Sequence, residues 1–199
     1  MLSHTTRSLA VIGCLVPAVV AWTAATNVLT LQPESRLWIK GTSTVRSFEC
    51  KAGALEAKVE SAPGATEALM SGTKAVTSAE VTIAADKLDC GNGTMNSHMK
   101  KALKVTEHPV IRFNIADYTL AKAAEGTQAE LTGALTLGGV EKPITVNALG
   151  KGEGDGKLRV TGTYELRMTE YGLKPPTLMM GTMKVNEKVN VGFDLLLKN

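Results

Sequence analysis

The sequence predicts an all-β protein, folded as an eight-stranded antiparallel barrel with one short helix. Eight segments alternate between apolar and polar residues, which is typical of strands with one buried and one solvated face. Short links join most of these segments, and a sheet of such strands loses its unpaired edges when it closes into a barrel. A two-sheet sandwich is the alternative architecture for the same strands.

The composition is that of an ordinary globular protein. Of the 199 residues, 44% are hydrophobic, 21% charged and 4% aromatic, so one domain, or two small ones, with a substantial core is expected. Lysine and arginine number 22 against 19 acids, and no run of five basic residues occurs. A nucleic-acid partner is therefore not expected.

The N-terminus has the pattern of a signal peptide. Arg7 precedes an apolar run at 9–20, which is too short to span a bilayer. The small residues that follow suit a signal peptidase, so we predict a signal peptide at 1–25, cleavage near Ala25 and a mature domain at 26–199. The protein is then periplasmic or secreted, and a retained N-terminal anchor is the alternative.

The predicted strands have a period of two residues. In 53–60, for example, Leu55, Ala57 and Val59 are apolar and charged residues separate them. Residues of like parity share a face, so a ligand inside the barrel would meet the apolar set. The predicted strands are 36–41, 53–60, 79–83, 111–115, 131–137, 144–149, 158–166 and 189–197. The predicted ligand-lining residues are Ile111, Phe113, Ile115, Leu131, Leu135, Val160, Tyr164, Val191 and Phe193.

The pair Gly138-Gly139 predicts a hairpin. With a two-residue loop, Leu137 lies opposite Val140 and every apolar side chain of both strands falls on one face. The further pairs are then Gly133 with Ile144 and Leu131 with Val146. Pro143 favours a four-residue turn of the same parity, because proline cannot donate to a ladder.

One segment lacks the alternation and is predicted to be a helix. Between Thr94 and Lys104 apolar residues recur at helical spacing, and lysines gather towards the C-terminal end, where the helix dipole favours cations. Thr94 is the expected N-cap, and the helix ends before His108-Pro109. A long connection containing glycine and proline is predicted at 169–188.

Removal of the signal peptide leaves two of the three cysteines, Cys50 and Cys90. An even pair in an exported chain predicts a disulfide, and two free thiols are the alternative. Closing a loop of about 40 residues stabilises a fold by roughly 4 kcal/mol on the chain-entropy model. No Cys-x-x-Cys motif occurs, so thioredoxin-type redox chemistry is not expected.

Few residues suggest catalysis or a metal. His98 and His108 lie in no motif for nucleophilic, zinc or nucleotide chemistry, so no catalytic residue, cofactor or metal site is predicted. A methionine cluster suits either Cu(I) or, the preferred interpretation, a flexible apolar flap. A basic cluster suits either an anionic head group or an ordinary solvated helix face. These clusters are Met168, Met179, Met180 and Met183, and Lys100, Lys101, Lys104 and Arg112.

Five sequence blocks, taken in order, resemble the YceI-like family of exported, lipocalin-like proteins that bind polyisoprenoid lipids. The resemblance covers about residues 31–198. The blocks are Leu37–Phe48, Asn96–Leu103 leading to His108–Phe113, Gly133–Ile144, Tyr171–Leu173 and Val189–Phe193. Gly41–Ser43 and Gly138 stand where the family often has polar residues, so that polar signature does not carry over.

The resemblance implies an up-and-down barrel with an elongated apolar pore for an isoprenoid chain, such as a quinone tail or a polyprenyl phosphate. The leading expectation is an exported lipid-binding protein, not an enzyme, that serves transport, storage or stress protection. Transient contact with a membrane surface and a homodimer are compatible with this expectation. The alternatives are a structural or stress-response barrel filled by its own side chains, and an enzyme that acts on a bound lipid.

Overall fold

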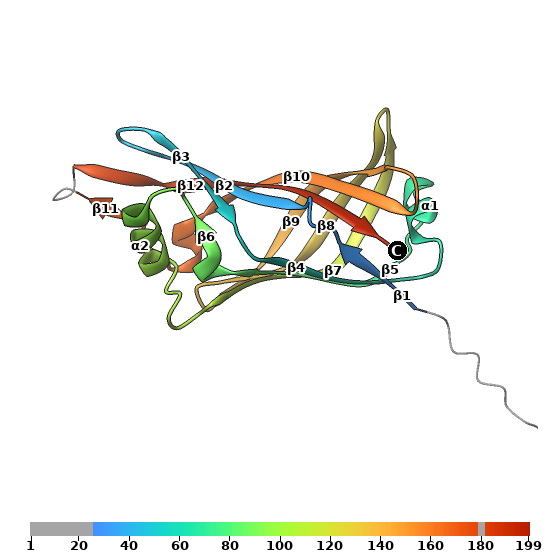
Figure 1. The fold of residues 1–199 in the computed structure, drawn as a ribbon, viewed down its shortest axis with the longest axis horizontal. Coiled ribbons are helices and arrows are strands. Elements are labelled where there is room, and N and C mark those ends of the chain that lie inside the picture. The colour runs from blue at the N-terminus through green and yellow to red at the C-terminus, as the bar shows by residue number, and fades with distance from the viewer. Residues whose placement is uncertain (1–25, 179–181) are drawn as a thin grey trace, which may run out of the picture.

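The computed structural model describes residues 26–178 and 182–199, which form an elongated antiparallel barrel (Figure 1). The predicted signal peptide lies outside these residues and stays a prediction. The strands are β1 (Asn27–Leu31), β2 (Arg36–Ser43), β3 (Ser47–Ala52), β4 (Leu55–Ser61), β5 (Val76–Ala84), β6 (Leu88–Asp89), β7 (Val110–Ala123), β8 (Gly126–Leu137), β9 (Val140–Gly152), β10 (Lys157–Arg167), β11 (Thr177–Leu178) and β12 (Met183–Lys198). The helices are α1 (Ala65–Met70) and α2 (Gly93–Ala102), and the 3-10 turns are η1 (Ala85–Lys87) and η2 (Met168–Tyr171).

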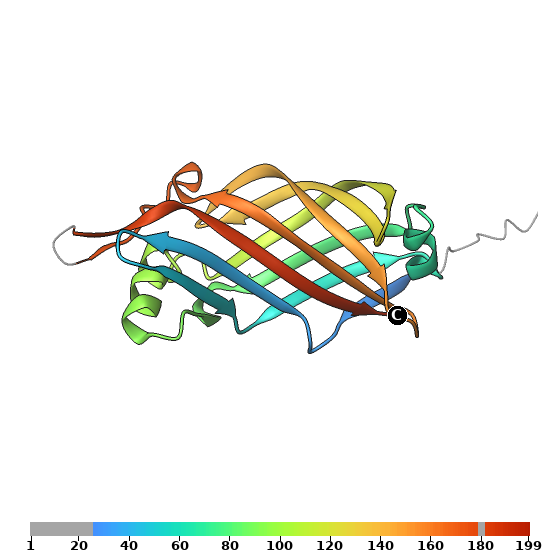
Figure 2. The same cartoon turned by 90° about the horizontal axis from the view of Figure 1, so that it is seen from above.

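The sheet closes because its first and last strands pair. The ring runs β1-β4-β5-β7-β8-β9-β10-β12, and Thr30 and Leu31 pair with Lys198 and Leu197. Beyond β1, the 16-residue strand β12 pairs with β2, so β1 and β2 act as one interrupted strand. Strands β3 and β4 continue each other in the same way, since β3 pairs with β2 and β4 with β1. The predicted eight-stranded up-and-down barrel is thereby confirmed (Figure 2).

Each predicted strand corresponds to one long strand of the barrel: β2, β4, β5, β7, β8, β9, β10 or β12. The short strands β1, β3, β6 and β11 were not predicted. The connection predicted at 169–188 is wrong from Met183 onward, where β12 begins, and it also contains the short strand β11.

The hairpin between β8 and β9 has the predicted register, with Leu137 paired to Val140 across a two-residue turn. Gly138 and Gly139 both have positive φ, 57° and 82°, which this tight turn requires. The longer turn inferred from Pro143 is wrong. Bonded and non-bonded pairs alternate along an antiparallel ladder, and Pro143 falls at a non-bonded pair with respect to β8. Its nitrogen faces the other side, where β10 pairs with β9 only from Asn147 onward.

The predicted helix at 94–104 is α2, but its N-cap is Asn92 and not Thr94. The Asn92 side chain accepts a hydrogen bond from the Met95 backbone N–H at 3.0 Å. Helix α1, only six residues long, is an additional element, and the two helices lie at opposite ends of the barrel (Figure 1). Within the described residues, neither is long and apolar enough to cross a bilayer.

The three phenylalanines each lie over a glycine of the neighbouring strand. A Cβ atom added to Gly41, Gly133 or Gly162 would collide with the ring of Phe48, Phe113 or Phe193 respectively. These rings fill the space left by the missing side chains. The three phenylalanines are therefore used to cover glycines of neighbouring strands.

Candidate functional site

An apolar cavity of about 300 Å³ lies inside the barrel. Side chains from β1, β2, β4, β5, β7, β8, β9, β10 and β12 line it, together with residues of both helices. Alternation along each strand points one apolar set inward, which is why the wall is built from so many strands. The wall of this cavity is thus apolar around the whole ring of strands.

All nine residues predicted from strand parity lie on the cavity wall. They share the inward face because the pairing of these segments keeps the parity of the predicted faces. Their contact with a ligand stays a prediction.

A β-bulge in β7 adds lining residues that parity missed. Ile115 pairs with Gly133 and Asp117 pairs with the adjacent Thr132, so one extra residue is inserted between Ile115 and Asp117. The inward face changes from odd to even numbers, and Tyr118 and Leu120 line the cavity beyond the bulge. The sequence itself indicates this bulge, because the apolar residues stand at odd positions up to Ile115 and at even positions from Tyr118 onward.

Helix residues close the two ends of the cavity. Leu69 and Met70 of α1 line one end, while Met99 of α2 and the following Leu103 line the other. Leu173 packs against Gly138 and belongs to a buried cluster against which Leu103 also packs, which adds a second layer at the α2 end. Sequence reasoning missed these residues because a lid helix contributes only one or two apolar side chains.

The polar groups at the α1 end are already hydrogen-bonded. The Tyr118 hydroxyl accepts from the Ala75 and Val76 backbone N–H groups at 2.8 and 2.9 Å. Thr127 Oγ1 donates to the Met70 carbonyl at 3.3 Å. Among the described residues that line the cavity, none carries a charged side chain or an imidazole. Such a wall suits a hydrocarbon and offers no acid, base or nucleophile pair.

The geometry and the sequence together identify the family. A family model described as a YceI-like domain matches residues 32–197. The chain belongs to the YceI-like family.

Three relatives place this YceI-like barrel among known proteins. The UPF0312 protein of Pseudomonas aeruginosa is 31% identical over 102 residues, covering 48% of this chain and 51% of the relative. The chain thus spans about half the length of the curated relatives it matches. BcnA of Burkholderia cenocepacia has a TM-score of 0.65 at 20% identity, covering 82% of this chain and 96% of its own. A polyisoprenoid binding domain from Saccharophagus degradans, implicated in plant cell wall breakdown, has a TM-score of 0.62 at 13% identity, covering 88% and 99%.

Two tyrosines lie together at the α2 end of the YceI-like barrel. Tyr164 lines the cavity, and Tyr171 is 1% exposed with a hydroxyl that has no hydrogen-bond partner. Burial raises the pKa of Tyr171 to about 12, with smaller contributions from Tyr164 and Glu170. Burial also raises the pKa of Tyr164, and the Glu170 carboxylate adds to that shift.

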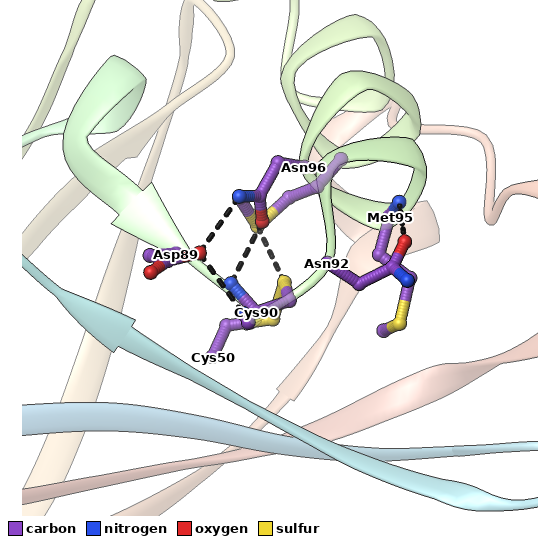
Figure 3. The surroundings of a disulfide bond; sticks show 8 residues. Cys50, Asp89, Cys90, Asn92, Met95 and Asn96 are labelled. Atoms are coloured by element: carbon purple, nitrogen blue, oxygen red, sulfur yellow. Dashed lines mark hydrogen bonds between the residues drawn. A yellow bond between two sulfur atoms is a disulfide. The ribbon is translucent and has the colours of Figure 1, made fainter.

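The predicted disulfide is present and anchors the start of α2 (Figure 3). Cys50 of β3 bonds to Cys90, which lies between β6 and α2. The Cys90 backbone N–H donates to Asn96 Oδ1, and Asn96 Nδ2 donates to Asp89 Oδ1, both at 2.7 Å. Cys90 Sγ also lies 3.6 Å from Sδ of the cavity-lining Met99. The bridge therefore contacts the cavity lid directly.

The remaining sequence clusters do not converge on a site. His98 is half-buried on α2, while the His108 ring lies against Gly139 in the β8–β9 turn. Arg112 pairs with Glu80 across β5 and β7 at 3.1 Å, so it does not join the lysines of α2. Met168 lines the cavity, whereas the predicted flap residues Met179 and Met180 lie outside the described residues. In the described part of the chain, no group of three or more His, Cys, Asp or Glu residues could hold a metal ion.

Proposed function

We propose that this YceI-like protein is an exported binding protein that holds an elongated isoprenoid lipid, of the quinone or polyprenyl type, inside the barrel. The observation that carries the proposal is the apolar cavity, whose described wall has no charged side chain. A structural neighbour that is itself a polyisoprenoid binding domain supports this ligand class. The protein would act as a carrier or store and not as an enzyme.

Burial of hydrocarbon supplies the affinity. Each CH₂ group removed from water contributes about 0.8 kcal/mol, so a few isoprene units suffice for tight binding without polar contacts. The cavity of about 300 Å³ is small for a long chain. Met70, Met99 and Met168 line its ends, and such unbranched thioether side chains adapt their shape to a bound chain.

Export is the second part of the proposal. The Cys50–Cys90 disulfide fits an oxidising compartment, and the 1–25 segment has signal-peptide features. We place the mature protein, 26–199, in the periplasm or outside the cell. There a water-filled space separates lipid sources from lipid acceptors, and brief contact with a membrane surface would load the barrel.

The decisive experiment is native mass spectrometry of protein expressed from Met1 and purified from the exported fraction without detergent. We expect a chain that begins near residue 26 and carries a co-purifying isoprenoid. A barrel that stays empty and also binds no added polyprenyl lipid would establish the alternative, a structural barrel without ligand. An intact N-terminus on the exported protein would overturn the signal peptide alone.

A further inference from the structure

The hydroxyl groups of the three tyrosines are used differently at the two ends of the cavity. At the α1 end, Tyr118 accepts two backbone N–H groups and donates to the Val76 carbonyl, so its capacity is spent. At the α2 end, the Tyr171 hydroxyl is buried without a partner, the one such side-chain oxygen or nitrogen in the described residues. Among the described residues, the buried hydroxyl without a partner therefore lies at the α2 end.

Tyr171 packs against the cavity wall. It belongs to a buried cluster whose other members include Leu137, Leu166, Met168 and Val189, and all four of these line the cavity. Met168 is unbranched, so it is the member of this cluster best able to change shape when a ligand approaches Tyr171.

The turn that carries Tyr171 is fixed to the barrel. Gly172 follows it in the left-handed conformation, and the Leu173 N–H closes the turn on the Met168 carbonyl at 3.2 Å. Thr169 Oγ1 donates to the Glu187 carboxylate of β12 at 3.0 Å. The phenol is thus held in an apolar cluster, although a buried polar group without a partner destabilises a fold by about 1–3 kcal/mol. A bound acceptor would remove that cost.

We propose that Tyr171, with Tyr164 beside it, forms the head-group subsite of the cavity and donates a hydrogen bond to a neutral carbonyl oxygen of the bound lipid, as found in a quinone. The inference rests on the proposed lipid-binding function. It specifies at which end of the barrel the head group lies and which chemical group the head group must carry.

The surroundings of the two phenols select against an anionic head group. No lysine, arginine or histidine is among the described residues on the cavity wall, so a diphosphate would enter without a counter-charge. The Glu170 carboxylate, which pairs with Arg167 at 3.6 Å, raises the pKa of both Tyr164 and Tyr171, so it disfavours negative charge on either phenol. A neutral carbonyl oxygen needs no counter-charge, and the Glu170 carboxylate does not exclude it.

Three probes with a similar isoprenoid tail test the subsite: a ubiquinone with four isoprene units, geranylgeranyl diphosphate and the C20 hydrocarbon phytane. We expect Tyr171→Phe to weaken quinone binding about three- to tenfold, the effect of one neutral hydrogen bond, and to leave phytane binding unchanged. The diphosphate should bind more weakly than the quinone to the wild-type protein. In infrared difference spectra, one quinone carbonyl band should shift to lower frequency on binding to the wild type and not to Tyr171→Phe.

Tyr118→Phe is the matched control, because it removes a hydroxyl from the opposite end of the same cavity. It should affect the quinone and phytane equally. Tyr171→Phe should also unfold at a slightly higher temperature than the ligand-free wild type, which separates loss of the subsite from loss of the fold. Equal loss of quinone and phytane affinity in Tyr171→Phe, or an unshifted carbonyl band in the wild type, would overturn the subsite. Failure of all three probes to bind would instead overturn the proposed function.

Discussion

Phe193 of β12 covers Gly162, its cross-strand partner in β10, and occupies the place where a Cβ atom would stand. The Asn147 carbonyl oxygen approaches the same point from β9, at 2.5 Å. Three strands are thus packed around a position that accepts only a hydrogen atom. The Phe193 ring fits into the barrel wall because it takes the space that a side chain at Gly162 would occupy.

Gly162→Ala should therefore destabilise the protein by about 1–3 kcal/mol, because the added methyl group forces the ring or the β9 backbone to move. Urea unfolding measures the change. Gly150→Ala is the matched control on β9, where a Cβ would meet its nearest atoms only at 3.6 and 3.7 Å. If both substitutions lowered the stability equally, strand propensity and not the Phe193 contact would account for the loss.

Filling the cavity should abolish lipid binding without unfolding the barrel. Ala79 lines the cavity, so Ala79→Phe places a ring in the space that the ligand would occupy. We expect affinity for a polyprenyl probe to fall at least tenfold. Ala121→Phe makes the same chemical change on the exposed outer face of β7 and should bind normally. Unchanged binding by Ala79→Phe would place the ligand outside the barrel.

Loss of the disulfide should weaken the fold and loosen the α2 end. The bridge spans 40 residues, for which the chain-entropy model gives up to about 4 kcal/mol. Reduction should lower the urea midpoint of the wild type and leave the Cys50→Ser/Cys90→Ser variant unchanged. Hydrogen exchange should rise first in α2. An identical midpoint before and after reduction of the wild type would show that the bridge contributes nothing.

Acid should weaken the anchor of α2. A hydrogen bond from Asn96, followed by one from the Gly91 backbone, lowers the pKa of Asp89 below its ordinary 3.8. Because the folded pKa is the lower one, the unfolded chain binds more protons between the two values. The contribution is therefore complete only about one pH unit above the unfolded pKa of 3.8, and it is lost as the pH falls through the folded pKa.

The test is the pH dependence of the urea midpoint between pH 2.5 and 5. Asp89→Asn should flatten the slope relative to the wild type, because it removes the titrating group. Asn96→Ala should flatten it too, since it removes the donor that lowers the Asp89 pKa. A slope that neither substitution alters would assign the acid sensitivity to other carboxylates.

The strand pattern predicted the barrel because strict alternation determines which face of each long strand is buried. It failed where the period changes, as at the bulge after Ile115, and where a strand is too short to show a period, as in the two-residue strands β6 and β11. Asn92 was missed as the N-cap because two acceptable caps lie two residues apart, and only the backbone geometry chooses between them. The unpaired Tyr171 hydroxyl has no sequence signal, since it depends on what the fold places around it.

Strand β12 pairs with β10 on one side and with both β2 and β1 on the other. The contact that completes the ring joins Thr30 to Lys198, residues 168 positions apart. Until the last strand is in place, the sheet is an open trough with two free edges and encloses nothing. The enclosed chamber therefore depends on a contact between the two ends of the described chain, so the capacity to hold a lipid and the completeness of the sheet are one property.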